Sequence, residues 1–211
     1  MYIAIEGVIG VGKTTLARLL QNTFDAEILL EVFEENPFLS DFYSDRERYA
    51  FQTQIFFLLS RYHQQRRTVH DMLETGKNLI ADYTFAKDAL FARINLKGDE
   101  LDMYYKVHEA LAEKIEKPNL LVYLQASTDT LMQRIATRDR SYERQMERSY
   151  IHELNLAYDD FFSKPFDHAP VLTIDTNHLN IIQDPEHLRW IENRIRQSLN
   201  EPPFQQSLPL P

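Results

Sequence analysis

The sequence predicts an α/β fold in which a five-stranded parallel sheet is flanked by helices. Short runs rich in Ile, Leu, Val and Tyr alternate with longer segments of helical period, which is the pattern of β–α units around a parallel sheet. Each short run is almost continuously apolar, as expected of strands that helices cover on both faces. A Gly-rich phosphate-binding motif stands between the first run and the first helical segment. A ligand site is therefore expected at the carboxyl ends of the strands.

The five predicted strands are residues 2–6, 27–33, 78–82, 119–125 and 171–175. Residues 46–75 carry apolar side chains at helical spacing and stop at Gly76, so one long helix is expected there. Asp184 is a suitable N-cap and Pro185 a suitable first helical residue, which begins a last helix that ends near residue 199. The other predicted helices are residues 14–22, 99–115, 128–138 and 145–162.

Residues 1–200 are predicted to form a single domain. No internal repeat and no linker divides the chain of 211 residues, and a hydrophobic content of 44% is enough for a core around one sheet. Residues 201–211 hold four prolines, and we expect this tail to be disordered.

The charge balance and the lack of cysteine narrow the expected partners. The chain has 32 acidic residues against 23 Lys and Arg, a net charge of -9 that repels a nucleic-acid backbone. Without cysteine there can be neither disulfides nor thiolate metal sites, which is compatible with the cytosol. The apolar runs are shorter than the roughly 20 residues that span a bilayer, and no room is left for a signal peptide. We therefore expect a cytoplasmic protein without a nucleic-acid or membrane partner.

Residues 7–14 match the motif G-x-x-x-x-G-K-[ST] in its required place between a strand and a helix. Its glycines let successive N–H groups turn toward phosphate oxygens, and the helix N-terminus adds a positive dipole end. Lys13 is expected on the β and γ phosphates and Thr14 on Mg²⁺. A surface turn with a solvated lysine is the alternative. The predicted nucleotide-binding residues are Gly7, Val8, Ile9, Gly10, Val11, Gly12, Lys13, Thr14 and Thr15.

A phosphate-binding loop leaves GTPases, motors, transporter ATPases and small-molecule kinases open. Two acids at strand ends help to decide: Glu31 within the second predicted strand and Asp82 at the close of the third. Phosphoryl transfer to an alcohol uses one carboxylate to accept the hydroxyl proton and another to hold Mg²⁺. Glu31 and Asp82 fit these roles, although a strand-end acid can also be merely solvated.

Arginines gather at the end of the helix after the fourth strand. Each of them could simply complement the helix dipole and pair with nearby acids. Together on a polar stretch between two helices, they indicate a mobile lid whose guanidinium groups balance the charge of a transferring phosphoryl group. The residues are Arg134, Arg138 and Arg140, with Arg144 close behind.

Over residues 2 to about 180, the sequence resembles the deoxynucleoside kinase family. The likeness rests on Ile5-Glu6-Gly7, the phosphate loop, Glu31, Ser60-Arg61, residues 82–88, Tyr123-Leu124-Gln125-Ala126, Arg134-Ile135 and Arg138-Asp139-Arg140. The branch of bacterial deoxyguanosine and deoxyadenosine kinases is indicated by Glu35-Asn36-Pro37-Phe38-Leu39, Phe42-Tyr43 and Ile80-Ala81-Asp82-Tyr83.

The resemblance implies a P-loop kinase fold with a lid, ATP as donor, Mg²⁺, and transfer of the γ-phosphoryl group to the 5′-hydroxyl of a deoxynucleoside. It implies that Glu31 is the base, that Asp82 lies near the metal, and that the lid contains Arg134, Arg138 and Arg140. The family reads the base with a Gln, an Arg and an Asp, which fall here on Gln54, Arg61 and Asp88. The sugar 3′-hydroxyl is bound at positions that fall on Tyr43 and Glu143. The family is typically homodimeric through helices like residues 46–75.

Gln54 and Arg61 lie two helical turns apart, so both can face one pocket, although a polar stripe on a half-exposed helix has the same spacing. The sequence departs from the family at Asp82-Tyr83-Thr84, where acid-Arg-Ser is usual. Tyr83, expected at the substrate, can donate a hydrogen bond but carries no charge. We expect Lys87 or a lid arginine to supply it.

The sequence thus predicts an ATP-dependent deoxynucleoside kinase of nucleotide salvage that prefers deoxyadenosine or deoxyguanosine, with deoxycytidine as another candidate acceptor. A nucleoside monophosphate kinase is an alternative, disfavoured because the Glu31 carboxylate would repel the acceptor's phosphate. A non-catalytic nucleotide-binding regulatory protein is a second alternative, suggested by Tyr83 and the proline-rich tail.

Overall fold

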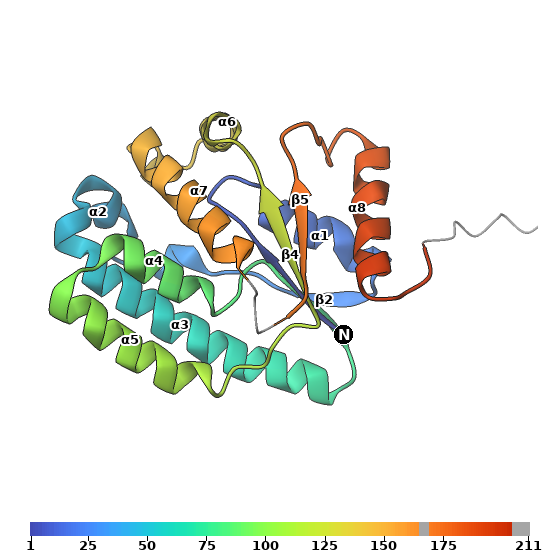
Figure 1. The fold of residues 1–211 in the computed structure, drawn as a ribbon, viewed down its shortest axis with the longest axis horizontal. Helices are drawn as coiled ribbons and strands as arrows, with labels where there is room; N and C mark the ends of the chain where they lie inside the picture. Colours follow the sequence, from blue (N-terminus) through green and yellow to red (C-terminus); the bar gives the residue numbers. More distant parts are fainter. Residues whose placement is uncertain (165–168, 204–211) are drawn as a thin grey trace, which may run out of the picture.

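The computed structural model describes residues 1–164 and 169–203, so most of the predicted disordered tail lies outside the described residues. Five parallel strands form one sheet in the order β2-β3-β1-β4-β5, which confirms the predicted fold class. Figure 1 shows this sheet at the centre of the molecule. Its strands are β1 (Tyr2–Glu6), β2 (Ala26–Leu29), β3 (Asn78–Ala81), β4 (Leu120–Gln125) and β5 (Val171–Asp175).

The central strand β1 sets where the phosphate loop lies. Ala4 is in register with Ala81 of β3 on one side and with Leu121 of β4 on the other. Because all strands are parallel, their carboxyl ends meet along one edge of the sheet, and the segments that follow β1, β2 and β3 come together there. These segments carry the phosphate loop, Glu31 and Asp82.

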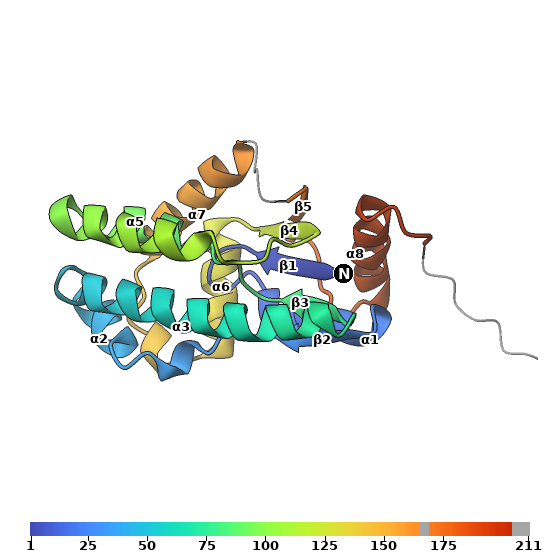
Figure 2. The same cartoon turned by 90° about the horizontal axis from the view of Figure 1, so that it is seen from below.

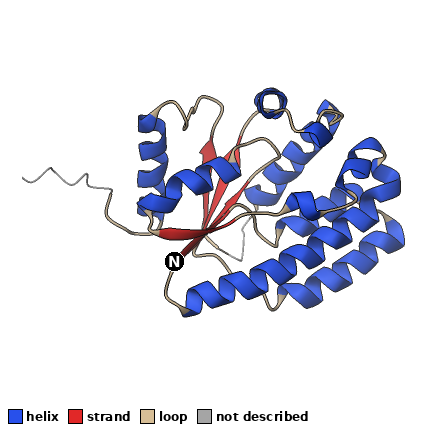
Figure 3. Ribbon diagram, turned by 180° about the vertical axis from the view of Figure 1, so that it is seen from behind, coloured by secondary structure: helices blue, strands red, loops and turns tan. Residues whose placement is uncertain are grey.

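Helices cover both faces of the sheet, as Figure 3 shows. One face is covered by α1 (Lys13–Thr23) and α8 (Pro185–Ser198), which contact each other. The other is covered by α3 (Arg46–Glu74), against which α5 (Gly98–Ala112) lies (Figure 2). The remaining helical elements are α2 (Leu39–Ser44), α4 (Lys87–Asn95), α6 (Thr128–Arg138), α7 (Arg148–Ser163) and the short 3₁₀ turns Phe33–Glu35 and Ser141–Glu143. None of the helices in the described part of the chain is long and apolar enough to cross a membrane.

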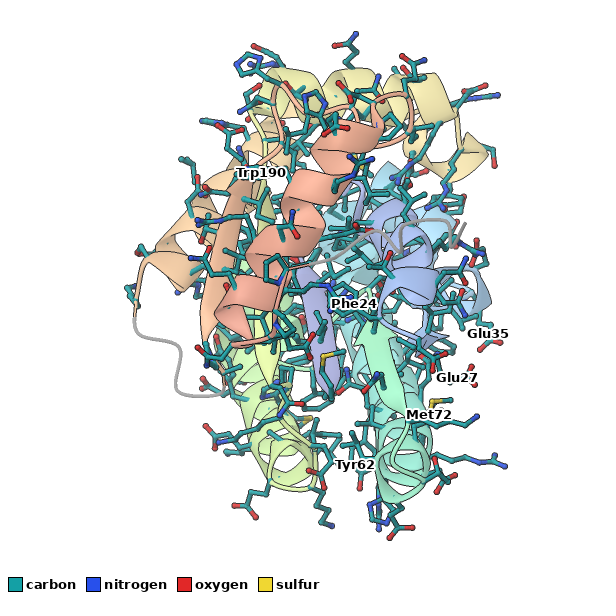
Figure 4. All side chains as sticks on the ribbon, turned by 90° about the vertical axis from the view of Figure 1, so that its right-hand side faces the viewer. Phe24, Glu27, Glu35, Tyr62, Met72 and Trp190 are labelled. Atoms are coloured by element: carbon teal, nitrogen blue, oxygen red, sulfur yellow. The ribbon has the colours of Figure 1, made fainter. Side chains whose placement is uncertain are left out.

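The apolar strands form the core because helices cover both of their faces, as their continuous apolar runs indicated. Along β1 the side chains alternate between the two faces, and all of them are buried. Ile3 and Ile5 pack in the main core with residues of α1, whereas Tyr2 and Ala4 pack in a smaller cluster with Val69 of α3. In Figure 4, Phe24 at the end of α1 lies beside α8, where Arg196 stacks over its ring at 4.7 Å.

Several element boundaries differ from the predictions. The second strand ends at Leu29, so Glu31 lies beyond it, because the backbone N–H of Glu31 donates to Asp82 at 2.8 Å instead of continuing the ladder. The helices α2 and α4 were not predicted. The six residues of α2 are too few to show a helical period, and α4 follows β3 after a short turn without a capping side chain.

Candidate active site

The phosphate loop has a backbone that only glycine adopts easily. Gly7 has φ 148° and Gly10 has φ 89°, both in the region that L side chains avoid. A Cβ atom at Gly7 would lie 2.5 Å from the carbonyl oxygen of Leu124, and one at Gly10 would lie 2.8 Å from a side-chain carbon of Ile135. The loop is therefore fixed by close packing against β4 and α6 as well as by its conformation.

Lys13 begins α1 and turns back over the loop. Its ammonium donates to the carbonyl oxygen of Gly7 at 2.7 Å and to that of Val8 at 3.3 Å. Burial is the main cause that lowers the pKa of Lys13 to about 8, and the charge of Lys87 lowers it further. A bound polyphosphate would supply the counter-charge that the loop carbonyls only partly provide.

Asp82 links the loop to the acidic side of the site. Its Oδ2 accepts a short hydrogen bond from the Thr14 hydroxyl, and its Oδ1 accepts one from the backbone N–H of Glu31 at 2.8 Å. Asp82 is almost fully buried. A hydroxyl and a carboxylate side by side, next to the place of the phosphates, form an oxygen-donor set of the kind that Mg²⁺ prefers.

Glu31 lies between two cations. One carboxylate oxygen accepts from Arg61 Nε at 2.8 Å, and the other accepts from Lys87 Nζ at 2.7 Å. Burial alone would raise the pKa of Glu31, but the charges and hydrogen bonds of Arg61 and Lys87 hold this pKa well below its ordinary value. The carboxylate is therefore charged and oriented, and it faces the same cavity as Lys13.

This cavity, which we call the acceptor cavity, has a volume of about 110 Å³. It lies between the phosphate loop, α3, α4 and the segment after α6. The structure brings a large part of the predicted site together around it: Lys13, Thr14, Glu31, Tyr43, Arg61, Asp82, Arg138, Arg140 and Glu143.

The segment after α6 contributes two arginines and an acid to the acceptor cavity. Arg138 donates from Nε to Glu143 at 2.8 Å, and Glu143 is itself buried. Arg140 stacks over the ring of Phe33 with 4.3 Å to its centroid. Both arginines line the same cavity as Gly10 and Lys13 of the phosphate loop. Movement of this segment as a lid stays a prediction.

A second cavity of about 640 Å³, the donor cavity, lies on the other side of the phosphate loop, between α6, α8 and the segment after β5. Arg134 lines the donor cavity and Arg140 lines the acceptor cavity, whereas Arg138 lines both. The guanidinium of Arg134 donates to the carbonyl oxygen of Val11 at 3.1 Å and to that of Thr176 at 2.7 Å. In this arrangement Arg134 tethers the loop to the segment after β5.

Three predicted substrate residues do not line the acceptor cavity. Tyr83 packs in the cluster beneath α3, and its hydroxyl donates to Gln64 at 2.6 Å. The reason is that Asp82 occupies the position after β3 that faces the loop, so the next side chain points to the opposite face. Gln54 and Asp88 are buried, and Asp88 is in contact with the site through a short ion pair with Arg61.

Glu6 is a further buried acid that the sequence reasoning did not single out. Its carboxylate accepts from the backbone N–H of Thr84 at 2.6 Å and from that of Gly7 at 3.3 Å, and the Tyr158 hydroxyl donates to it at 3.3 Å. It therefore ties the start of the phosphate loop to the segment after β3. A charged residue at the end of an otherwise apolar run was the signal that could have revealed it.

The chain is similar to known proteins in sequence and in fold. Residues 3–200 match the family model of deoxynucleoside kinases. The chain is 38% identical over 175 residues to deoxyguanosine kinase of Bacillus subtilis (strain 168), which covers 83% of this chain and 84% of that protein. It is 30% identical over 207 residues to deoxyadenosine/deoxycytidine kinase of the same organism, with 94% and 93% coverage. The solved structure of deoxyadenosine kinase from M. mycoides with bound dATP is similar with a TM-score of 0.80 and 26% identity, over 93% of this chain and 99% of that one.

Proposed function

The chain belongs to the deoxynucleoside kinase family and uses ATP to phosphorylate a deoxynucleoside; on that premise we propose that its preferred acceptor is deoxyguanosine or deoxyadenosine. The similar proteins named for deoxyguanosine and deoxyadenosine support the purine preference. The arrangement of Glu31 opposite Lys13 across one cavity carries the assignment of roles, because it sets a carboxylate against a phosphate loop. Family membership also sets aside the monophosphate kinase and the non-catalytic regulator.

In the proposed mechanism, Glu31 accepts the proton of the 5′-hydroxyl and orients its oxygen toward the γ phosphorus. The backbone N–H groups of residues 7–14 and the Lys13 ammonium hold the donor phosphates. Arg138 and Arg140 balance the charge that develops on the transferring group. Tyr43 and Glu143, which line the same cavity, bind the sugar.

Lys87 supplies the charge that is missing at Tyr83. Its side chain is 5% exposed, and its ammonium lies 2.7 Å from Glu31 and 5.5 Å from the centroid of the Tyr83 ring. Lys87 is the first residue of α4 and follows Asp82 and Tyr83 after a turn, so the cation comes to the cavity from a different element. We assign to Lys87 the role of holding Glu31 and facing the 5′-hydroxyl.

Mg²⁺ would be held by Thr14 and Asp82, whose side chains are in contact and offer only oxygen atoms. The ion would neutralise part of the charge on the donor phosphates. The chain's own part is to keep the two oxygens adjacent, which the hydrogen bond from the Glu31 backbone to Asp82 secures.

A homodimer that forms through α3 and α5 is part of the proposal. Leu59 of α3 is 42% exposed and Met103 of α5 is 57% exposed, so both helices carry apolar side chains on their outer surfaces. Sedimentation velocity should give twice the mass of 25.0 kDa, and Leu59→Asp should shift the protein toward monomer.

A cytoplasmic location is also part of the proposal, and the use of ATP supports it.

An assay with labelled ATP against the four deoxynucleosides and their monophosphates tests the function. We expect the highest kcat/KM with deoxyguanosine or deoxyadenosine and no product in Lys13→Ala. Lys77→Ala is the matched control, because its ammonium pairs with Glu27 on the surface. Turnover only of thymidine would refute the purine preference, and faster turnover of a monophosphate would refute the acceptor class.

A further inference from the structure

Both oxygens of the Glu31 carboxylate are engaged by cations. Oε1 accepts from Arg61 Nε at 2.8 Å and also contacts Arg61 Nη2. Oε2 accepts from Lys87 Nζ at 2.7 Å. A general base has to turn an available lone pair toward the hydroxyl from which it takes a proton. In this arrangement Arg61 makes both of these contacts to Oε1, so Oε1 is not available to a hydroxyl.

Arg61 connects this carboxylate to a second one. While Nε and Nη2 of Arg61 contact Glu31, Nη1 makes a short contact with Oδ1 of Asp88. Asp88 is fully buried, and no described residue donates a hydrogen bond to its Oδ2. A buried carboxylate oxygen without a partner is costly, so this oxygen favours any ligand that brings an N–H group to it. Purine bases carry such groups on their edges.

The acceptor cavity is too small for a nucleoside. Its volume is about 110 Å³, whereas small-molecule pockets usually measure roughly 300–1,000 Å³. Side chains that line it must move on binding. Arg61 lines the cavity and touches both the proposed base-reading acid Asp88 and the catalytic Glu31, so its displacement enlarges the cavity and frees Glu31 Oε1 in one movement.

We propose that Oε1 of Glu31 is the oxygen that takes the proton and that Arg61 blocks it until a nucleobase draws the guanidinium away, so that recognition of the base switches on the general base. This coupling rests on the proposed function and adds to it that base identity is expressed in kcat. It also suppresses ATP hydrolysis. In that side reaction a water oxygen bonds to the γ phosphorus, the bond to the β,γ-bridging oxygen breaks to release ADP, and Glu31 takes a proton from the water.

The test compares wild type with Arg61→Met in two reactions that involve no nucleobase. One is hydrolysis of ATP alone, and the other is phosphorylation of 1,2-dideoxyribose, which carries the sugar hydroxyl but no base. We expect both rates to rise about tenfold in the variant, as for the loss of one charge-assisted hydrogen bond to Glu31. Turnover of deoxyguanosine should fall in the same variant. If Arg61 only reads the base, the variant gains in neither reaction.

The double variant Arg61→Met with Asp88→Asn keeps the charges of the cluster balanced and serves if the single variant does not fold. A measurement on wild type needs no substitution: free adenine or hypoxanthine should raise the turnover of 1,2-dideoxyribose several-fold in wild type and leave it unchanged in the variant. Equal rates throughout, with no effect of free base, would overturn the coupling. Failure of wild type to phosphorylate any deoxynucleoside would instead refute the proposed function.

Discussion

The donor and acceptor sides of the phosphate loop are built in different ways. The donor side is open, at about 640 Å³, and rests on backbone: a loop shaped by glycines and tied by Arg134 to carbonyl oxygens. The acceptor side measures about 110 Å³ and rests on paired side chains, with Glu31 held by Arg61 and Lys87. On the proposed function, a backbone cradle can hold the phosphates of any nucleoside triphosphate, whereas a side-chain cluster that rearranges on binding can select its ligand.

The largest effect is expected on kcat, from a substitution of the general base on the acceptor side. Glu31→Gln should lower kcat by about 10² to 10⁴, the usual range for loss of a general base, and leave the Kd of ATP within about twofold. Single-turnover rates and equilibrium binding of ATP measure the two quantities. The matched control is Glu27→Gln, because Glu27 lies on the surface of the preceding strand (Figure 4) and pairs with Lys77. If Glu31→Gln raised the Kd of ATP by as large a factor as it lowered kcat, the donor and acceptor sides would not act separately.

The next effect tests the backbone cradle. Gly7→Ala adds a methyl group 2.5 Å from the Leu124 carbonyl oxygen in a conformation that alanine avoids. We expect a loss of about 1–3 kcal/mol in the free energy of unfolding and a tenfold or larger rise in the Kd of ATP. Gly76→Ala is the control, since its φ is also positive but its Cβ would meet no atom within 4 Å. If Gly76→Ala weakens ATP binding as much, local packing at the loop is not the cause.

A smaller effect tests the cation that holds Glu31. Lys87→Ala should lower kcat by roughly tenfold to a hundredfold, as for one charge-assisted hydrogen bond, with little change in the Kd of ATP. Lys87→Arg should recover most of the loss because it keeps the charge. Retention of full kcat in Lys87→Ala would mean that the lid arginines supply the charge instead.

The smallest effect concerns a residue that the fold removes from the site. Tyr83→Phe should cost about 1 kcal/mol in the free energy of unfolding, because it deletes the hydrogen bond to Gln64. Its kcat should match that of wild type. Chemical denaturation and steady-state rates measure the two quantities. A tenfold fall in kcat would instead support the contact between Tyr83 and the substrate that the sequence predicted.

The fold was largely predictable, and so was the place of the phosphate loop between the first strand and the first helix. The strands Tyr2–Glu6 and Val171–Asp175 and the helix Thr128–Arg138 have the predicted bounds, because hydrophobic period and nearby breakers fix them locally. The helices Leu39–Ser44 and Lys87–Asn95 were missed, since short helices show little period. The lid and the single-domain organisation stay predictions.

The sequence by itself determined the phosphate loop, since a conformation set by glycines between a strand and a helix depends only on neighbours along the chain. Only the tertiary structure decided that Arg61 and Lys87 meet at Glu31, that Arg134 and Arg140 line different cavities, and that Tyr83 turns away. Glu31 lies 30 residues from Arg61 and 56 from Lys87. Contacts at such separation follow from how helices pack on the sheet. The positions of charged residues along the sequence do not specify which of them will line the same cavity.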